Sequence, residues 1–275
     1  MNTINSNWAV LVTGASSGLG ARTAELLAAQ GYRVAGAARR VERITGLPGV
    51  MPVHLDLTDP ASVVQAVDIV ESQLGPVGTL INDAGYGEFG SLEETPSEQA
   101  RHQFEVNVFG PATLTQRLLR PMREARSGRI VNVSSLAGEF SSPMGGWYHA
   151  SKFALEALSD SLRAEVRPFG ITVTVVQPGP VRTPWHEQAM ALLEHASGHG
   201  PYKQMARAVA AYHRSNRDKP ITSDVDTVAA AIVHAATTPH PRPRYRVGRG
   251  AGTAVAISRL PDRTFDALTR RQFGL

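Results

Sequence analysis

The sequence WAVLVTGASSGLGARTAELLAAQG, residues 8–31, decides the fold. Its apolar start, Trp8–Thr13, has the length of a buried strand, and a helical pattern follows over Ala21–Gln30 until Gly31 supplies a stop. A glycine-rich turn joins the two. Glycines let the backbone approach a pyrophosphate, and the start of a helix favours its negative charge. The stretch therefore predicts a nucleotide-binding strand–turn–helix, although its GxxxGxG spacing differs from the commoner GxGxxG.

Strand and helix patterns alternate along the rest of the chain. This alternation predicts an α/β fold in one domain over residues 1–275: a doubly wound, Rossmann-like parallel sheet with helices on both faces. Right-handed crossovers place the ends of all the strands at one edge of that sheet. Later strands are expected at Tyr32–Ala38, Val50–Leu55, Val77–Asn82, Arg129–Val133, Thr172–Val176 and Arg244–Val247. Later helices are expected after Thr58 or Asp59, over 96–124 with a kink at Asn107–Pro111, and over 148–167, 223–237 and 260–271.

Composition narrows the classes of function. The 275 residues are 42% apolar, enough for a packed core. The absence of cysteine excludes disulfides and thiolate catalysis and suits a cytoplasmic protein. The nine histidines lack metal-ligand spacing, so no metal is expected. The net charge of +4 is too diffuse to indicate nucleic acid, and the start of the chain reads as a strand rather than as a signal peptide or a membrane span.

A second stretch, VNVSSLAGEFSSPMGGWYHASK at 131–152, carries candidate chemistry. Tyr148 and Lys152 are four residues apart, so a helix presents them on one face. A nearby cation lowers the pKa of a phenol from its usual value of about 10, which would make Tyr148 an acid/base near neutrality. Ser135, at the end of a strand, is placed to meet the phenol across a substrate oxygen. Taken alone, such a Tyr–Lys pair is usually just part of a helix surface.

The end of the second strand indicates the coenzyme. NAD-binding folds usually carry an acid there for the ribose hydroxyls, but this chain reads Ala37-Ala38-Arg39-Arg40. An arginine suits the 2′-phosphate of NADP. The sequence thus predicts NADP(H) over NAD(H), with Arg39 as the main determinant. Asp56, after the third strand, is either a turn residue or a neighbour of the adenine.

These motifs together resemble the short-chain dehydrogenase/reductase family from Thr13 to about Gly248. TGASSGLG resembles its cofactor loop, NDAG at 82–85 its NNAG turn, and PGPVRT at 178–183 its nicotinamide-side turn. Asp83 replaces the usual second Asn of the NNAG turn, where we expect no effect on chemistry. Five motifs in order at matching spacing are far more specific than any one of them.

The resemblance implies NAD(P)(H)-dependent interconversion of an alcohol and a carbonyl. It makes Tyr148 the acid/base, with Lys152 on the nicotinamide ribose, Ser135 on the substrate oxygen and Asn107 holding a water. Asn82 would brace the sheet edge, and Thr183 would touch the carboxamide. With the patterns above, the predicted cofactor site comprises Gly14, Ser16, Ser17, Gly18, Leu19, Gly20, Arg39, Asp56, Leu57, Asn82, Ala84, Gly85, Tyr148, Lys152, Pro178, Gly179, Val181 and Thr183.

Other predictions concern substrate and partners. The irregular segment 185–220, rich in aromatic residues and Met, is expected to cover a lipophilic small-molecule substrate. The resemblance implies a homodimer or homotetramer, paired through the helices that carry Asn107 and Tyr148. Two other functions remain open: a catalytically idle redox sensor, although the chain keeps Ser, Tyr and Lys, and a nucleotide-sugar epimerase or dehydratase, which would need more chain after Gly179.

Overall fold

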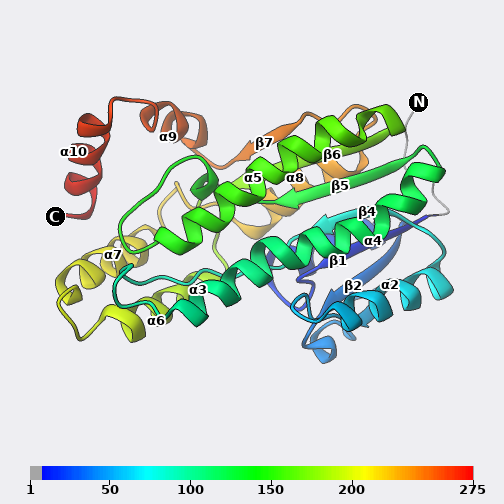
Figure 1. Cartoon of the computed structure of the whole chain (residues 1–275), viewed down its shortest axis with the longest axis horizontal. Coiled ribbons are helices and arrows are strands. Elements are labelled where there is room, and N and C mark those ends of the chain that lie inside the picture. Colours follow the sequence, from blue (N-terminus) through cyan, green and yellow to red (C-terminus); the bar gives the residue numbers. More distant parts are fainter. Residues whose placement is uncertain (1–7, 275) are drawn as a thin grey trace.

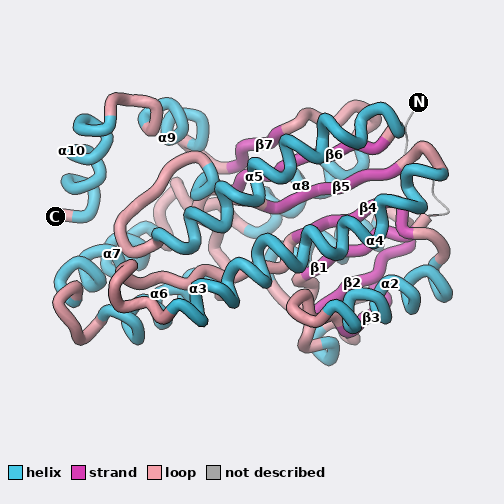
Figure 2. Tube along the Cα trace, in the orientation of Figure 1, coloured by secondary structure: helices cyan, strands magenta, loops and turns pink. Residues whose placement is uncertain are grey.

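The strands form one parallel sheet. A computed structural model describes residues 8–274. Neighbouring strands pair in the order β3-β2-β1-β4-β5-β6-β7, and every pair is parallel, which confirms the predicted doubly wound sheet (Figure 1, Figure 2). The strands are β1 (Ala9–Thr13), β2 (Arg33–Ala38), β3 (Val50–His54), β4 (Val77–Asn82), β5 (Gly128–Val133), β6 (Ile171–Pro178) and β7 (Arg244–Val247).

Helices cover both faces of the sheet (Figure 1). On one face lie α2 (Pro60–Leu74), α4 (Gly110–Glu124) and α5 (Gly146–Val166), and on the other α1 (Gly18–Ala29) and α8 (Val225–Thr237). Within residues 8–274, no helix is both long and apolar enough to cross a membrane.

The strand β1 shows how the two cores arise. All five of its residues are buried. Leu11 packs into the core with α2 and α4, whereas Val10 and Val12 pack into the core with α1 and α8. Successive side chains of a strand point to opposite faces, so a strand buried on both faces needs an unbroken apolar run. The run at the start of the chain meets that requirement.

Carboxylates cap two of the helices. The Asp59 side chain accepts from the N–H of Ala61 at 2.9 Å and begins α2, and Asp224 accepts from the N–H of Thr227 at 2.7 Å and begins α8. Each carboxylate satisfies an N–H that has no partner within its helix. Of the alternatives open from the sequence, Asp59 rather than Thr58 and Asp224 rather than Ser223 are therefore the caps.

The predicted kink near Asn107 is a π-helical turn. Residues Glu105–Phe109 form this turn between α3 (Ser97–Phe104) and α4, so the expected single helix is divided there. The next residue, Gly110, lies against Leu57: a Cβ at Gly110 would come within 2.6 Å of the Leu57 Cβ and carbonyl oxygen. The close approach explains the glycine, and π turns are frequent at functional sites.

The segment after β6 is more regular than predicted. It forms α6 (Trp185–Ser197) and α7 (Lys203–Asn216), whose apolar side chains share a third core.

The C-terminal arm consists of α9 (Ala251–Ile257), which the sequence analysis missed, and α10 (Asp262–Phe273). Figure 1 shows the arm beyond the end of the sheet, on the side of α7. Phe273 of α10 contacts Tyr212 of α7, with ring centroids 4.8 Å apart.

Replacing Leu118 tests the core between α4 and the sheet. Leu118 is fully buried there, so Leu118→Ala should lower the free energy of unfolding by about 2–5 kcal/mol. Urea denaturation measures this change. The matched Leu92→Ala variant, at a side chain 73% exposed, should leave stability nearly unchanged. Equal effects of the two substitutions would contradict the packing described.

Candidate active site

A cavity of about 600 Å³ opens at the carboxyl ends of the strands. It has two ends, one beside the glycine-rich turn and one beside α6, α7 and the arm. Of the predicted site residues, these line it: Gly14, Ser16, Ser17, Gly18, Leu19, Arg39, Asp56, Leu57, Ala84, Gly85, Ser135, Tyr148, Lys152, Pro178, Gly179, Val181 and Thr183. Gly20, Asn82 and Asn107 lie behind its wall.

Gly14 and Gly20 bring α1 close to the sheet edge. Gly14 has φ +72°, and a Cβ there would lie 2.9 Å from the backbone nitrogen of Ala84. A Cβ at Gly20 would lie 2.6 Å from the carbonyl oxygen of Gly14. Gly20 therefore serves packing rather than ligand contact. The helix start faces the cavity without a side-chain cap from Ser17 and without an acid in its first turn. Its exposed N–H groups and dipole suit an anion, so the site fits a pyrophosphate.

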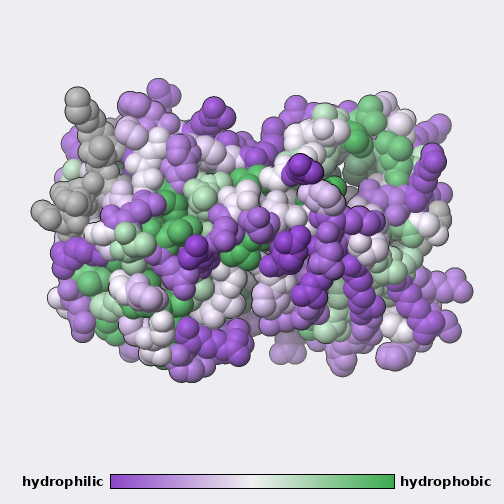
Figure 3. Space-filling view, turned by 180° about the vertical axis from the view of Figure 1, so that it is seen from behind, coloured by the Kyte–Doolittle hydropathy of each residue, from purple (hydrophilic) through white to green (hydrophobic). Residues whose placement is uncertain are grey.

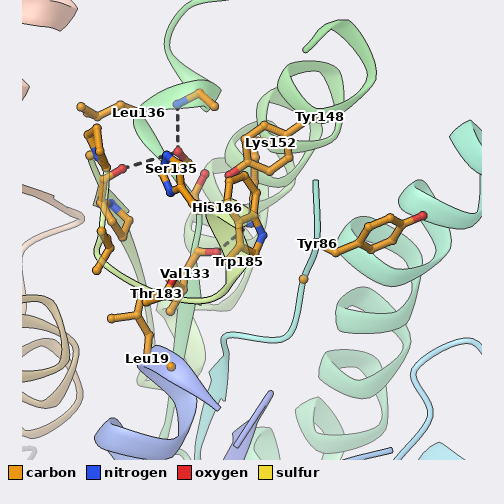
Figure 4. A pocket seen from close by; sticks show the side chains of 18 of the residues that line it. Leu19, Tyr86, Val133, Ser135, Leu136, Tyr148, Lys152, Thr183, Trp185 and His186 are labelled. Carbon is orange, nitrogen blue, oxygen red and sulfur yellow. Dashed lines mark hydrogen bonds between the residues drawn. The ribbon is translucent and has the colours of Figure 1, made fainter. Parts of the chain in front are cut away.

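The turn after β6 closes this end of the cavity. The Gly179 N–H donates to the Val247 carbonyl at 2.8 Å, and Val181 forms a parallel bridge with Ser223. Thr183 then reaches the glycine-rich turn, where its Cγ2 lies 3.6 Å from the Cβ position at Gly18. Figure 4 shows Thr183 and Leu19 next to each other. Contacts from two distant parts of the chain thus form one wall.

Ser135, Tyr148 and Lys152 come together as predicted (Figure 4). Ser135 hydrogen-bonds the Tyr148 phenol. Its Oγ also accepts from the Ala137 N–H at 3.1 Å, which fixes its position at the end of β5. The Lys152 Nζ donates to the Val133 carbonyl at 3.1 Å. All three side chains are held by the short segment that joins β5 to α5.

The expected effect of Lys152 on Tyr148 is not found. Burial raises the pKa of Tyr148 to about 12, and the Ser135 hydrogen bond only partly offsets it. Burial also lowers the pKa of Lys152 to about 8, against the negative charges of Asp83 and Glu156. Because the ammonium is directed to the Val133 carbonyl and both side chains are buried, desolvation dominates over attraction. The phenol is therefore protonated at neutral pH.

Asn107 and Asn82 support the site from behind. Asn107 Nδ2 donates to the Tyr86 carbonyl at 2.9 Å and to Ser151 Oγ at 3.1 Å, while its Oδ1 accepts from the Tyr86 N–H. Asn82 Nδ2 donates to Asn132 Oδ1 at 2.9 Å, tying β4 to β5 as expected of a bracing residue. Neither side chain reaches the cavity.

Arg39 and Asp56 lie at the adenosine end expected from the sequence. Arg39 is exposed and lines the cavity at the end of β2. Asp56 Oδ1 accepts from both the N–H and the hydroxyl of Thr58, at 2.9 and 2.8 Å. Asp56 is thus a turn residue that also lines the cavity, and its place beside an adenine stays a prediction.

The other end of the cavity is lined by residues that sequence reasoning did not assign. Phe89 packs on Tyr148 with ring centroids 5.5 Å apart, and Trp185 packs on Tyr148 at 5.1 Å. Figure 4 shows Trp185 and His186 beside the tyrosine, whereas the Tyr86 ring points away from them. Further lining residues come from three separate segments: Phe140, His149, Tyr212, His213, Ile257, Phe265 and Phe273. The aromatic content of residues 185–220 was the one feature of the sequence that indicated some of these lining residues.

Asp83 is more than a turn residue. Its carboxylate accepts from the backbone N–H of Gly20, and it lines the cavity near Lys152. Burial raises its pKa to about 7, although Lys152 and the Gly20 hydrogen bond act in the opposite direction. The substitution of Asp for the usual Asn therefore places a titrating group beneath the glycine-rich turn.

Comparison with known proteins identifies the family. The sequence model described as short chain dehydrogenase matches residues 8–192. The chain belongs to the short-chain dehydrogenase family. The crystal structure of a short-chain dehydrogenase from Streptomyces avermitilis is 34% identical to it, with a TM-score of 0.77 over 96% of this chain and 94% of that one.

Two curated relatives of this short-chain dehydrogenase are named reductases. The NADPH-dependent 3-dehydrocapnine reductase of Ornithobacterium rhinotracheale is 33% identical, with 94% of each chain covered. The 3-ketodihydrosphingosine reductase of Bacteroides thetaiotaomicron is 42% identical over 63% of this chain and 64% of its own, less than two thirds of that relative's length. This short-chain dehydrogenase is an NAD(P)-dependent oxidoreductase acting on CH–OH groups, which favours the first of the three functions considered from the sequence.

Replacing Asp83 by Asn should raise the Tm at pH 8. The folded pKa of about 7 lies above the 3.8 of the free side chain, so ionisation destabilises the folded protein. That cost is absent below about pH 4, grows as the pH rises toward 7 and is complete above it. The gain of Asp83→Asn, about 2–4 °C for each kcal/mol recovered, should therefore shrink as the pH falls. Calorimetric scans from pH 5 to pH 8 measure it. Asp266→Asn, at an exposed acid of α10, is the control, and a gain for Asp83→Asn independent of pH would contradict the burial of its charge.

Proposed function

We propose that this chain reduces the carbonyl group of a lipophilic substrate with NADPH, using Tyr148 as the proton donor. One observation carries the proposal: a buried, protonated phenol lies between a cofactor-type glycine turn and an apolar chamber. A phenol that is protonated at neutral pH can donate to the developing alkoxide, because the alkoxide is more basic than the phenolate.

Each residue of the site has its own role in the proposed reduction. Ser135, already hydrogen-bonded to the phenol, donates to the substrate oxygen and orients the carbonyl. The hydride for the carbonyl carbon would come from NADPH held at the glycine-rich turn and Arg39. As negative charge develops on the oxygen, Tyr148 passes its proton to it, so that an alcohol forms. Lys152, with its Nζ held at the Val133 carbonyl, would bind the hydroxyls of the nicotinamide ribose. Asn107 keeps the π turn and the 85–86 backbone in place beside Lys152.

Arg39 supports the choice of NADPH. It directly follows β2 at the adenosine side of the cavity, and neither Ala37 nor Ala38 offers a carboxylate to a 2′-hydroxyl. A guanidinium binds a phosphate through two charge-assisted hydrogen bonds. The relative from Ornithobacterium rhinotracheale is named as NADPH-dependent, in agreement with this choice.

The chamber around Tyr148 supports a lipophilic substrate. Its walls are largely aromatic and aliphatic, and they come from α6, α7 and the arm. Seen from behind, hydrophobic surface lies around a hollow at the end of the molecule that carries the arm (Figure 3). Ile257, Leu260 and Leu268 of the arm are exposed there. The names of the two reductases describe action on a 3-keto and a 3-dehydro compound, which fits a ketone substrate.

The segment 185–220 is proposed as the cover of this chamber, since Trp185 and His213 both line it.

We also propose a homo-oligomer. Phe109, Phe153 and Leu158, on the π turn and α5, are large apolar side chains that are 54%, 45% and 48% exposed. A second copy of the same helices would remove them from water.

Tyr148→Phe tests the proton donor. The ring and its contacts with Phe89 and Trp185 remain, but the proton is lost, so turnover should fall by about 10²–10⁴-fold. NADPH affinity, measured by fluorescence titration, should change little, because the phosphate contacts lie at the other end of the cavity. Leu92→Ala serves as the surface control for turnover. Near-normal turnover in the Phe variant would refute the role of Tyr148.

Arg39→Ala tests the coenzyme preference. Loss of a hydrogen bond to a charged phosphate costs roughly 1.5–3 kcal/mol, or about one to two decades of NADPH affinity. NADH affinity should barely change, because NADH has no 2′-phosphate. Titrations of both coenzymes at low salt give the ratio, with Arg43→Ala as a nearby exposed control. Equal weakening of NADH and NADPH would show that Arg39 does not read the phosphate.

A further inference from the structure

Three histidines line the substrate end of the cavity, and they differ in their hydrogen bonds. His149 is fixed at both nitrogens: Nδ1 pairs with the Ala137 carbonyl at 3.0 Å and Nε2 with Ser142 Oγ at 2.9 Å. His186 hydrogen-bonds the backbone of Val181. The rings of His149 and His186 are therefore positioned by hydrogen bonds to other groups of the protein.

His213 differs from both. Its Nε2 is buried, yet it has no hydrogen-bond partner among the residues the structure describes. Such an atom is costly inside a protein, and buried polar atoms without partners are rare. The ring is fixed on three sides, by Phe89 at 6.0 Å, His186 at 5.4 Å and Tyr212 at 5.6 Å between centroids. The unpaired nitrogen therefore belongs to a ring in the wall of the cavity, and because it has almost no exposed area, a ligand reaches it through a small shift of that ring.

The charges around His213 determine which kind of substrate group it can bind. Burial lowers its pKa to about 4, and the neighbouring His186 and His149 lower it further, so the ring is neutral at physiological pH. The groups facing it are the other two histidines, Tyr212 and Phe89; burial and the charge of Arg217 also lower the pKa of His186. Among the described lining residues, Asp56 and Asp83 are the carboxylates, and both lie at the cofactor end. An ammonium group here would lose its hydration without a counter-charge.

We propose that His213 is a specificity residue that hydrogen-bonds an uncharged polar substituent of the substrate, a hydroxyl group, near the carbonyl that is reduced. The substrate class is thus a long-chain hydroxy ketone rather than a plain aliphatic ketone. This inference rests on the proposed carbonyl reductase function and adds the substrate's second polar group.

The position of His213 sets where that hydroxyl lies. Tyr148 and His213 are both neighbours of Phe89, with ring-to-ring steps of 5.5 and 6.0 Å. Trp185 and His186 complete the circle on the other side, at 5.1 Å from Tyr148 to Trp185 and 5.6 Å from Trp185 to His186. In the proposed pose the carbonyl lies at Tyr148 and the hydroxyl at His213, across this circle of rings, while the rest of the chain extends toward Phe265 and Phe273.

The test compares three substrates in matched variants. They are a twelve-carbon ketone, its analogue with a hydroxyl two carbons from the carbonyl, and the corresponding amine. The native chain should prefer the hydroxy ketone. His213→Phe keeps the ring but removes the nitrogen, so kcat/KM for the hydroxy ketone should fall by about three- to tenfold. For the plain ketone, kcat/KM should change less than twofold.

Two further variants separate recognition from folding. His213→Gln restores a polar group at a similar reach and should recover much of the preference. His234→Phe, at an exposed histidine of α8 against Tyr245, should leave the preference unchanged. A structural defect would lower kcat/KM for all three substrates together, which would overturn the inference. A native preference for the amine, or a preference for the hydroxy ketone that survives in His213→Phe, would also overturn it.

A binding measurement keeps the inference independent of turnover. Calorimetry compares a long-chain diol with the matching mono-alcohol in the native chain and in His213→Phe. Tighter binding of the diol, lost in the variant, supports the role of His213 even if neither ketone is reduced. In that case the proposed reductase function fails while the subsite stands. If instead the plain ketone is reduced but the native chain and His213→Phe bind the diol equally well, the reductase function stands and the His213 subsite is wrong.

Discussion

The close contact between the glycine-rich turn and the turn after β4 is the constraint on which the site depends. There is no room for a Cβ at Gly14 against the backbone of Ala84, or for one at Gly20 against the backbone of Gly14. The start of α1 is thereby held against the carboxyl edge of the sheet, with its N–H groups directed into the cavity. Because a parallel sheet brings its other strand ends to the same edge, Ser135, Tyr148 and Lys152 then lie within reach of a ligand bound there.

Desolvation is the second shared feature of the site. Tyr148, Lys152 and Asp83 are all shifted toward their neutral forms, and burial is the largest cause for each. The attraction between Lys152 and Asp83, and the Ser135 hydrogen bond to Tyr148, offset only part of that cost. Burial strengthens the effect of any charge that develops during the reaction. The same burial keeps the proton on the Tyr148 oxygen until a more basic alkoxide forms beside it.

The two ends of the cavity are built on different principles. The cofactor end is made of backbone turns at strand ends, braced by side chains such as Asn82 and Asn107 that do not line the cavity. The substrate end is made of side chains from α6, α7 and the arm, which pack in their own apolar core beyond the sheet. The backbone turns suit a ligand that is the same across a family, whereas helices and an arm are segments that can differ without disturbing the sheet.

The sequence by itself determined the sheet, its strand ends and the set Ser135, Tyr148 and Lys152, because apolar runs, glycine turns and i, i+4 spacing are local signals. Only the tertiary structure decided the pKa of Tyr148, since the direction of the shift depends on burial and on where Lys152 points. It alone also brought His213 to Phe89 and Phe273 to Tyr212, contacts between segments far apart in the chain. Such contacts arise from packing between distant segments, and no local pattern in the sequence signals them. The protonation of the site residues and the choice of substrate therefore depend on the folded cavity.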